Sequence, residues 1–257
     1  MDPSPRWRRG AAAVLLAAGL VASSTVPASG APAFGADVSW PQCGQRYPAR
    51  PGFAVIGVND GRPYTANPCL VSEFAWAQSS GPVEFYMNTA NPGVAPGDAY
   101  TYGFNAARDA YGYANTRVKA GPGHPWWLDV EIGNSWSGDH AANAAVIGGS
   151  VAFLRAQGVM VGIYSTRYQW GVITGGARIP SVPNWVPGAL SASQAPAFCA
   201  PQQSFTGGPV AMTQFTTEFD HDFACPGVSL AAPAPPAPPP NPVGNLLNAV
   251  LAWLRSL

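Results

Sequence analysis

Two acidic residues stand one residue apart in the segment Trp126-Trp127-Leu128-Asp129-Val130-Glu131-Ile132. In a β-strand, alternate side chains share a face, so Asp129 and Glu131 point the same way with Cα atoms about 6.6 Å apart. Two carboxyl groups this close repel, and apolar surroundings raise the pKa of at least one. Hydrolysis of a glycosidic bond needs a protonated acid beside an ionised carboxylate. The segment therefore predicts a catalytic acid pair, the alternative being an edge strand with an acidic outer face.

Two more acidic segments lie far from this pair in the chain. Segment 35–40 is a candidate strand that carries Asp37, and in segment 218–223 the acids Glu218, Asp220 and Asp222 alternate on one face. Alone, Asp37 could cap a turn, and Asp220 and Asp222 could bind Ca²⁺ or decorate a sheet edge. A closed barrel brings its first and last strands together, and its active residues lie at strand ends. We therefore expect all three groups to meet at one barrel mouth.

Motifs for other chemistries are missing from the chain. It has three histidines, and no Gly-x-Ser-x-Gly elbow, His-Glu-x-x-His, Cys-x-x-Cys or phosphate-binding Gly-rich loop. His221 stands between two aspartates, but a strand turns its ring away from both, which disfavours a metal site. We expect no metal and no cofactor.

Eight short apolar segments rich in β-branched and aromatic residues recur along the chain, at 34–39, 53–58, 83–88, 126–132, 159–165, 184–186, 210–215 and 218–224. Helical patterns separate several of them, at 68–79 with Asn67 as N-cap, at 99–116 and at 139–157. This alternation predicts an α/β fold with a parallel sheet, closed into an irregular TIM-like (β/α) barrel of about eight strands with five or fewer helices.

The two ends of the chain differ from its middle. Three arginines, an apolar run of about 12 residues and small residues predict a secretory signal peptide at 1–30, because the run is too short for the alternative, a membrane anchor. Residues 231–243 form a Pro-rich linker, and 244–257 a short amphipathic helix. We expect that helix to dock loosely on the domain or to lie disordered, the alternative being a contact with a membrane or a partner. The barrel domain is then 31–230.

Export would change the net charge of the mature chain and place its cysteines where disulfides form. Removing the signal peptide leaves ten basic and twelve acidic side chains, a net charge of −2, which favours neither nucleic-acid binding nor stable membrane insertion. We expect a monomer, secreted or associated with the cell wall. Four cysteines in an oxidising compartment allow three pairings, of which we favour the local ones, Cys43–Cys69 and Cys199–Cys225.

Four motifs in order resemble glycoside hydrolase family 25 lysozymes, in a secreted branch of actinobacterial character. They are Gly35-Ala36-Asp37-Val38-Ser39, Leu128-Asp129-Val130-Glu131, Val161-Gly162-Ile163-Tyr164-Ser165, and Gln214-Phe215-Thr216 followed by Asp220. The resemblance covers roughly residues 34–225 and implies an irregular barrel of eight strands and five helices.

The resemblance also implies roles for individual residues. Glu131 would be the general acid and Asp129 would orient or activate, with Asp37 and Asp220 completing an acidic floor. Tyr86 and Tyr164 would line the sugar groove. The implied substrate is the β-1,4 bond between N-acetylmuramic acid and N-acetylglucosamine in peptidoglycan.

Two segments depart from the family's pattern. Gly57-Val58-Asn59-Asp60-Gly61 stands where the family has Lys-Ala-Thr-Glu-Gly, and Tyr86-Met87-Asn88 stands where it has Tyr-His-Phe. We therefore expect a secreted glycosidase of cell-wall glycan, peptidoglycan above all. The alternatives are an inactive barrel that binds wall glycan or a protein partner, and a Ca²⁺-dependent glycan-binding module built on Asp220 and Asp222.

Overall fold

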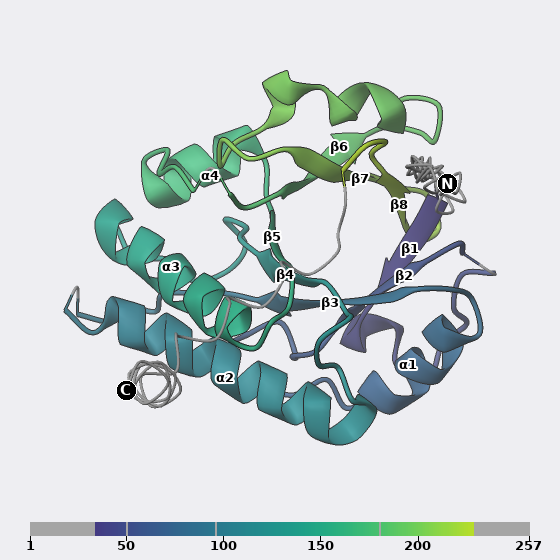
Figure 1. The fold of residues 1–257 in the computed structure, drawn as a ribbon, viewed down its shortest axis with the longest axis horizontal. Helices are drawn as coiled ribbons and strands as arrows, with labels where there is room; N and C mark the ends of the chain where they lie inside the picture. The colour runs from purple at the N-terminus through teal and green to yellow at the C-terminus, as the bar shows by residue number, and fades with distance from the viewer. Residues whose placement is uncertain (1–33, 50, 96, 180, 229–257) are drawn as a thin grey trace, which may run out of the picture. The chain divides into compact units, whose positions relative to one another are not determined.

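The structure is a computed structural model that describes residues 34–49, 51–95, 97–179 and 181–228. Its eight strands close into one barrel in chain order (Figure 1). The strands are β1 (Phe34–Val38), β2 (Ala54–Gly57), β3 (Val83–Asn88), β4 (Trp126–Asp129), β5 (Val161–Tyr164), β6 (Asn184–Ala189), β7 (Val210–Thr216) and β8 (Asp220–Ala224). The predicted signal peptide, linker and terminal helix lie outside the described residues and stay predictions.

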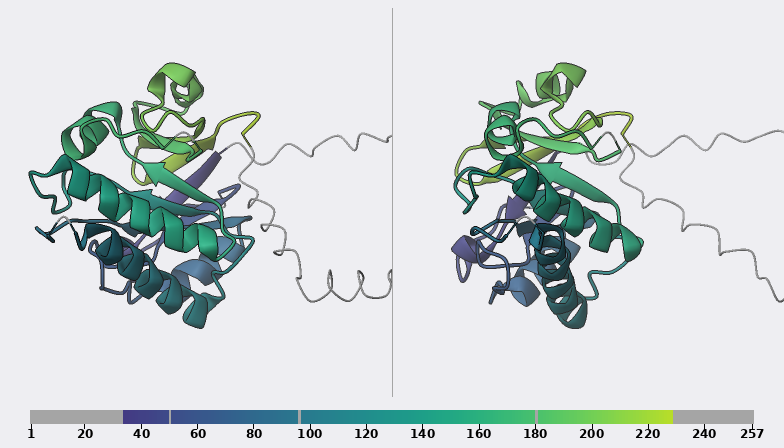
Figure 2. Two further views of the ribbon diagram at one scale, coloured as in Figure 1. Left: turned by 60° about the vertical axis from the view of Figure 1, so that its left-hand side comes forward. Right: turned by 90° about the vertical axis from the view of Figure 1, so that its left-hand side faces the viewer.

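Four α-helices accompany the strands in the described part of the chain: α1 (Leu70–Gln78), α2 (Ala99–Val118), α3 (His140–Ala156) and α4 (Arg167–Thr174). The predicted irregular (β/α) barrel is therefore confirmed. Helices α2 and α3 lie side by side on the outside of the barrel (Figures 1 and 2). Their backbones approach so closely that a Cβ added at Gly103 would lie 1.8 Å from the carbonyl oxygen of Val146. Glycine is therefore required in α2 although it weakens an isolated helix.

The last strand runs the opposite way from the expected parallel sheet. β8 pairs antiparallel with both β7 and β1, whereas the other neighbouring strands pair in parallel. Only residues 217–219 separate β7 from β8. A parallel return needs a crossover of about a dozen residues, so this connection can only form a hairpin. As a consequence, the start of β8 lies at the same end of the barrel as the carboxyl ends of the other strands.

The barrel is irregular on both sides of β6. Between β6 and β7 the described chain forms the short 3-10 helices η2 (Ala195–Cys199) and η3 (Pro201–Gln203), and β5 pairs with β6 over only two residue pairs. The register between β6 and β7 also shifts near Pro187. Proline lacks the backbone N–H that a regular ladder uses.

Several element boundaries differ from the sequence-based expectations. Asn67 does not cap α1, because α1 begins at Leu70 after Cys69 and the Asn67 side chain accepts from the Cys69 amide. Asp139 does cap α3, accepting from the amides of Ala141 and Ala142 at 2.9 and 3.0 Å. Helix α4 was not predicted because it is only eight residues long.

The two largest clusters of buried apolar side chains lie in different regions. One lies between the strands and helices, and the other lies inside the barrel around Trp127, Trp185 and Met212. Disulfides join Cys43 to Cys69 and Cys199 to Cys225, the two local pairings that we favoured. They hold the loop after β1 to the start of α1, and η2 to the residue after β8.

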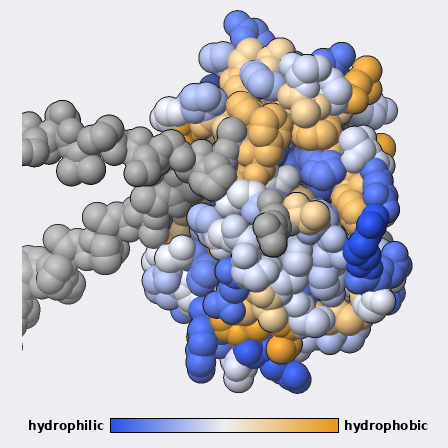
Figure 3. Space-filling model, turned by 90° about the vertical axis from the view of Figure 1, so that its right-hand side faces the viewer, coloured by the Kyte–Doolittle hydropathy of each residue, from blue (hydrophilic) through white to orange (hydrophobic). Residues whose placement is uncertain are grey.

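The surface carries apolar residues scattered among polar ones, as on the face in Figure 3. In the described segments, every helix is too short or too polar to span a bilayer.

Candidate active site

One cavity of about 130 Å³ opens at the end of the barrel where the carboxyl ends of the parallel strands lie. Eight side chains line it: Asp37, Tyr86, Asp129, Glu131, Tyr164, Trp185, Gln214 and Asp220. The six residues that the sequence assigned to catalysis and substrate binding are all among them, while Trp185 and Gln214 were not anticipated. The lining contains four carboxyl groups and no lysine or arginine.

Strand pairing explains why acids so distant in sequence meet here. Asp37 near the end of β1 lies directly opposite Asp220 at the start of β8, because those strands are antiparallel. Asp129 ends β4 and pairs with Asn88 of β3 and Tyr164 of β5. Parallel strands end at a common edge, so their last inward side chains form a ring.

Glu131 lies beyond the strand rather than within it, which corrects the expected strand 126–132. β4 ends at Asp129, and Glu131 is held by the following loop. Its carbonyl oxygen accepts a hydrogen bond from the Trp136 indole N–H at 2.7 Å and another from the backbone N–H of Asn134 at 3.1 Å. Val130 still donates to the Tyr164 carbonyl at 2.9 Å, so the chain remains extended long enough for both acids to reach the cavity.

Burial raises the pKa of both members of this acid pair. The pKa of Asp129 is raised well above its usual value by burial, then by the nearby charges of Glu131 and Asp37. Burial also raises the pKa of half-buried Glu131, partly offset by Gln169, whose side-chain amide donates to Glu131 Oε1 at 3.5 Å. Two interacting acids titrate as a pair, so one proton is shared between them over a range of pH.

A polar chain crosses the cavity floor to Asp37. The Tyr164 hydroxyl donates to Gln214 Oε1 at 2.8 Å, and Gln214 Nε2 donates to Asp37 Oδ2 at 2.8 Å. Burial and the charge of Asp220 raise the pKa of Asp37 to about 8, and the bond from Gln214 limits that rise. Asp37 therefore carries a proton at neutral pH while its carboxyl group stays oriented.

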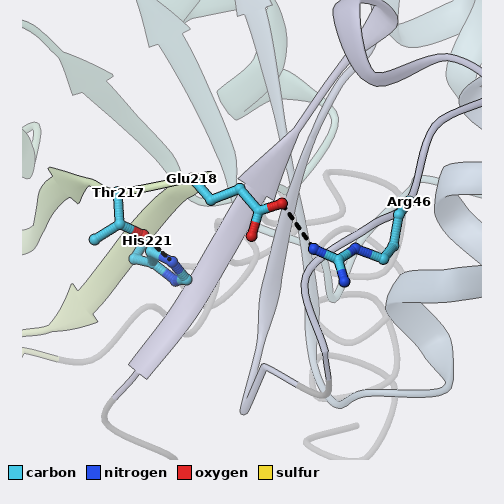
Figure 4. A network of polar contacts seen from close by, with 4 residues as sticks. All are labelled: Arg46, Thr217, Glu218 and His221. Carbon is cyan, nitrogen blue, oxygen red and sulfur yellow. Dashed lines mark hydrogen bonds and ion pairs between the residues drawn. The ribbon is translucent and has the colours of Figure 1, made fainter.

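Two acids of the last segment do not reach the cavity. Glu218 lies in the β7–β8 turn on the surface, where it pairs with Arg46 at 2.7 Å (Figure 4), so the expected alternation of three acids on one strand face is wrong. Asp222 is fully buried two residues further along β8 than Asp220. Its burial and the charge of Asp37 raise its pKa well above the usual value.

His221 faces away from the acids, as a strand requires. Its ring stacks on Phe215 with centroids 5.2 Å apart, and its Nε2 lies 3.0 Å from the Thr217 hydroxyl (Figure 4). Among the described residues, no group of three or more His, Cys, Asp or Glu side chains is arranged to bind a metal.

The departures from the family's pattern have a visible cause. A Cβ added at Gly57, where the family carries lysine, would lie 2.1 Å from Ser39 Oγ and 2.8 Å from the Tyr86 ring. The side chains of Ser39 and Tyr86 therefore occupy the space that a lysine side chain at position 57 would need. The lining of the cavity accordingly has no lysine ammonium group. The second departure introduces Asn88, whose side-chain amide donates to Asp129 Oδ2.

The unanticipated residues had weak sequence signals. Gln214 belongs to the closing motif, which implies no role for it, and Trp185 lies in the strand expected at 184–186, which is too short to show which face points inward. Nothing in sequence spacing points to Asn88 or Gln169, because their partners are 41 and 38 residues away.

Fold and site together define a class: an irregular (β/α) barrel with an acid-lined cavity at its mouth. Comparison with known proteins shows which proteins of this class the chain resembles. The model of a family described as Lysozyme-like protein 1 matches residues 65–187. A probable GH family 25 lysozyme 4 of Dictyostelium discoideum is 40% identical over 58 residues, 21% of this chain and 27% of that protein.

One further relative and one solved structure are also similar to this chain. Lysozyme-like protein 5 of Caenorhabditis elegans is 41% identical over 70 residues, 27% of this chain and 30% of that protein. The structure of a family GH25 lysozyme from Aspergillus fumigatus superposes with a TM-score of 0.54 at 16% identity, covering 76% of this chain and 95% of that one. The alignments span less than a third of the length of either curated relative.

The resemblance to the lysozyme-type superfamily of glycoside hydrolase family 25 is confirmed by these findings, in sequence over the middle of the chain and in fold over most of it. The actinobacterial branch stays a prediction.

Proposed function

We propose that this protein is a secreted glycosidase that hydrolyses cell-wall glycan, with the β-1,4 bond between N-acetylmuramic acid and N-acetylglucosamine as its target. One observation carries the proposal: Asp37, Asp129, Glu131 and Asp220 converge from three segments on one cavity at the barrel mouth. Glycoside hydrolysis uses a protonated acid and a second carboxylate on either side of the scissile bond. The lysozyme relatives support the same class of reaction.

In this proposal Glu131 is the general acid. It is the more open member of the pair, and burial raises its pKa, so it holds a proton that it can give to the leaving oxygen. Asp129, almost fully buried beside it, orients or activates the group that attacks the sugar. Asp37 and Asp220 complete the polar floor, and the rings of Tyr86 and Tyr164 form the walls against which the sugar lies.

The direct test incubates the mature protein with purified cell walls and counts new reducing ends. We expect release by the wild type, and loss of about 10²-fold or more in Glu131→Gln, which cannot donate a proton. Glu218→Gln is the matched control, because that acid lies on the surface in a pair with Arg46. Equal activity in wild type and Glu131→Gln removes Glu131 from the mechanism.

A second candidate is a barrel that binds wall glycan without cleaving it. The filled space at Gly57 and the missing cation favour it, because they change the wall of the cavity relative to the family's pattern. Retention of the protein on walls, with no reducing ends from several walls and soluble glycans, supports the binder and rejects the hydrolase.

Export and the monomeric state belong to the same proposal. Mass spectrometry of the protein from culture medium should give an N-terminus near residue 31, and light scattering should give the mass of one chain. A chain that stays in the cell with residues 1–30 attached contradicts export.

A further inference from the structure

Two asparagines at the ends of neighbouring strands hold each other at the barrel mouth. The backbone N–H of Asn88 donates to Asn59 Oδ1 at 3.0 Å, and Asn59 Nδ2 donates to the Asn88 carbonyl oxygen, also at 3.0 Å. Asn59 is fully buried, so these bonds are not exchanged for water. The end of β3 is therefore fixed by a side-chain clamp just beyond β2.

The clamp presents the Asn88 side chain to Asp129. Asn88 and Asp129 are directly paired residues of β3 and β4, and Asn88 Nδ2 donates to Asp129 Oδ2. The other oxygen, Asp129 Oδ1, is buried and has no hydrogen-bond partner, although Asp129 lines the cavity. One carboxyl oxygen is thus occupied by the protein, and the other is left for a substrate or a proton.

An N–H donor makes the two oxygens of Asp129 chemically different. Oδ2 must act as an acceptor, so a proton on this group sits on Oδ1. A hydrogen bond from a donor also favours the ionised form, which opposes the effect of burial. Glu131 receives only the longer contact of 3.5 Å from Gln169. The stronger donor therefore shifts the proton shared by the pair away from Asp129 and toward Glu131.

We propose that Asn88, held by Asn59, is a positioning residue for the acid pair: it fixes Asp129 with Oδ1 free and biases the shared proton toward Glu131. The inference deepens the proposed function and depends on it for its catalytic meaning. Other titratable groups also face Asp129, from β1, β3, β5, β8 and the loop after β4, namely Asp37, Tyr86, Tyr164, Asp220 and Glu131. Asn88 does not titrate, and its side-chain amide donates to the Asp129 carboxyl group; the side chain of Asn134 also lowers the pKa of Asp129.

The two asparagines are also among the residues that depart from the resembled family's pattern, where threonine and phenylalanine stand at these positions. Neither of those side chains can reproduce the amide clamp, and phenylalanine has no donor for a carboxylate. The arrangement around Asp129 is therefore a property of this chain's own residues.

The kinetic test replaces Asn88 with leucine, which has a similar size and no donor. We expect kcat on a cell-wall or soluble glycan substrate to fall roughly 10- to 100-fold, since a charge-assisted hydrogen bond biases the proton distribution by about that factor. KM should change little, and the acidic limb of the kcat profile should move to higher pH because Asp129 ionises less readily. Asn88→Gln keeps an amide and should restore part of the loss.

Thr89→Val is the matched control. The Thr89 hydroxyl donates to the backbone carbonyl of Asp129 at 2.6 Å and does not touch its carboxyl group. That carbonyl keeps the Thr89 backbone N–H at 3.1 Å, so the variant perturbs the same strand pair without altering the acid pair. Thermal melting confirms that all variants fold. A pH profile in Asn88→Leu that matches those of wild type and Thr89→Val overturns the proposal.

A second measurement separates this inference from the proposed function. The titration of the Asp129 carboxyl group, followed by ¹³C NMR, should shift upward by about one pH unit or more in Asn88→Leu and stay at the wild-type value in Thr89→Val. This result stands even if the wild type cleaves no glycan, in which case only the hydrolase proposal fails. An unchanged Asp129 titration in Asn88→Leu rejects the positioning role.

Discussion

Replacing Glu84 by glutamine should stabilise the protein at alkaline pH and leave it unchanged in acid. Glu84 points into the barrel from β3, is 6% exposed, and its Oε2 accepts from the Trp127 indole at 2.6 Å. Burial raises its pKa from 4.5 to about 7, although the bond from Trp127 opposes that rise. Glutamine keeps an oxygen for the Trp127 indole and removes the charge.

The magnitude follows from linkage between protonation and folding. The rise from 4.5 to about 7 corresponds to about 3.4 kcal/mol. Below pH 4.5 both forms of residue 84 are neutral, so wild type and variant should unfold alike. As pH rises from 4.5 to 7, the unfolded wild type loses its proton before the folded one does, so stability falls. Above pH 7 the variant should be more stable by about 3 kcal/mol, or about 6–12 °C in Tm for a domain of this size.

Urea unfolding at pH 4, 7 and 9, with the midpoint and slope fitted at each pH, measures this difference. Glu218→Gln is the control, because its exposed carboxyl group should give less than about 0.5 kcal/mol at any pH. A Glu84→Gln difference at pH 9 below about 1 kcal/mol, or one independent of pH, would refute the reasoning that burial of this carboxyl group raises its pKa.

Three further predictions concern packing, covalent links and capping. Gly57→Ala should destabilise by about 1–3 kcal/mol in urea unfolding, because its Cβ would lie 2.1 Å from Ser39 Oγ. Adding Ser39→Gly should recover part of that loss, since the Tyr86 ring still lies 2.8 Å from the added Cβ, and no recovery would contradict the clash with Ser39. Replacing both Cys43 and Cys69 by alanine removes a link across 26 residues and should lower unfolding free energy by about 3.5 kcal/mol, with an unchanged midpoint arguing against it. Asp139→Ala should cost about 1 kcal/mol by thermal melting, whereas a neutral result would mean that water replaces this cap on α3.

Local patterns were sufficient for most of the barrel. Each of the eight strands overlaps a segment expected from alternation and β-branched content, and the order of strands and long helices is as predicted. Boundaries were less accurate: Glu131 falls after β4, and Asn67 bonds inside a turn instead of capping α1. These ends depend on which neighbouring chain supplies hydrogen bonds, and strand periodicity carries no such information.

Residue types alone identified the acidic residues as candidates for the site, but they did not show which role each one has. Asp220, Asp222 and Glu218 look alike in the sequence, yet one lines the cavity, one is buried below it and one pairs with Arg46 outside. The hairpin between β7 and β8 decides among them, because it reverses the last strand and places its first residue at the mouth. A three-residue connection could have indicated that reversal.

The amino-acid sequence by itself determined the order of the strands and the one-residue spacing of Asp129 and Glu131, and it favoured the local disulfide pairing among three that it allowed. Tertiary structure alone decided which polar groups hold those acids, since Gln214 donates to Asp37 across 177 residues and Asn88 to Asp129 across 41. The reason is physical: side-chain periodicity reports on the nearest turn or strand, whereas these hydrogen bonds exist only after distant strands have closed into a barrel.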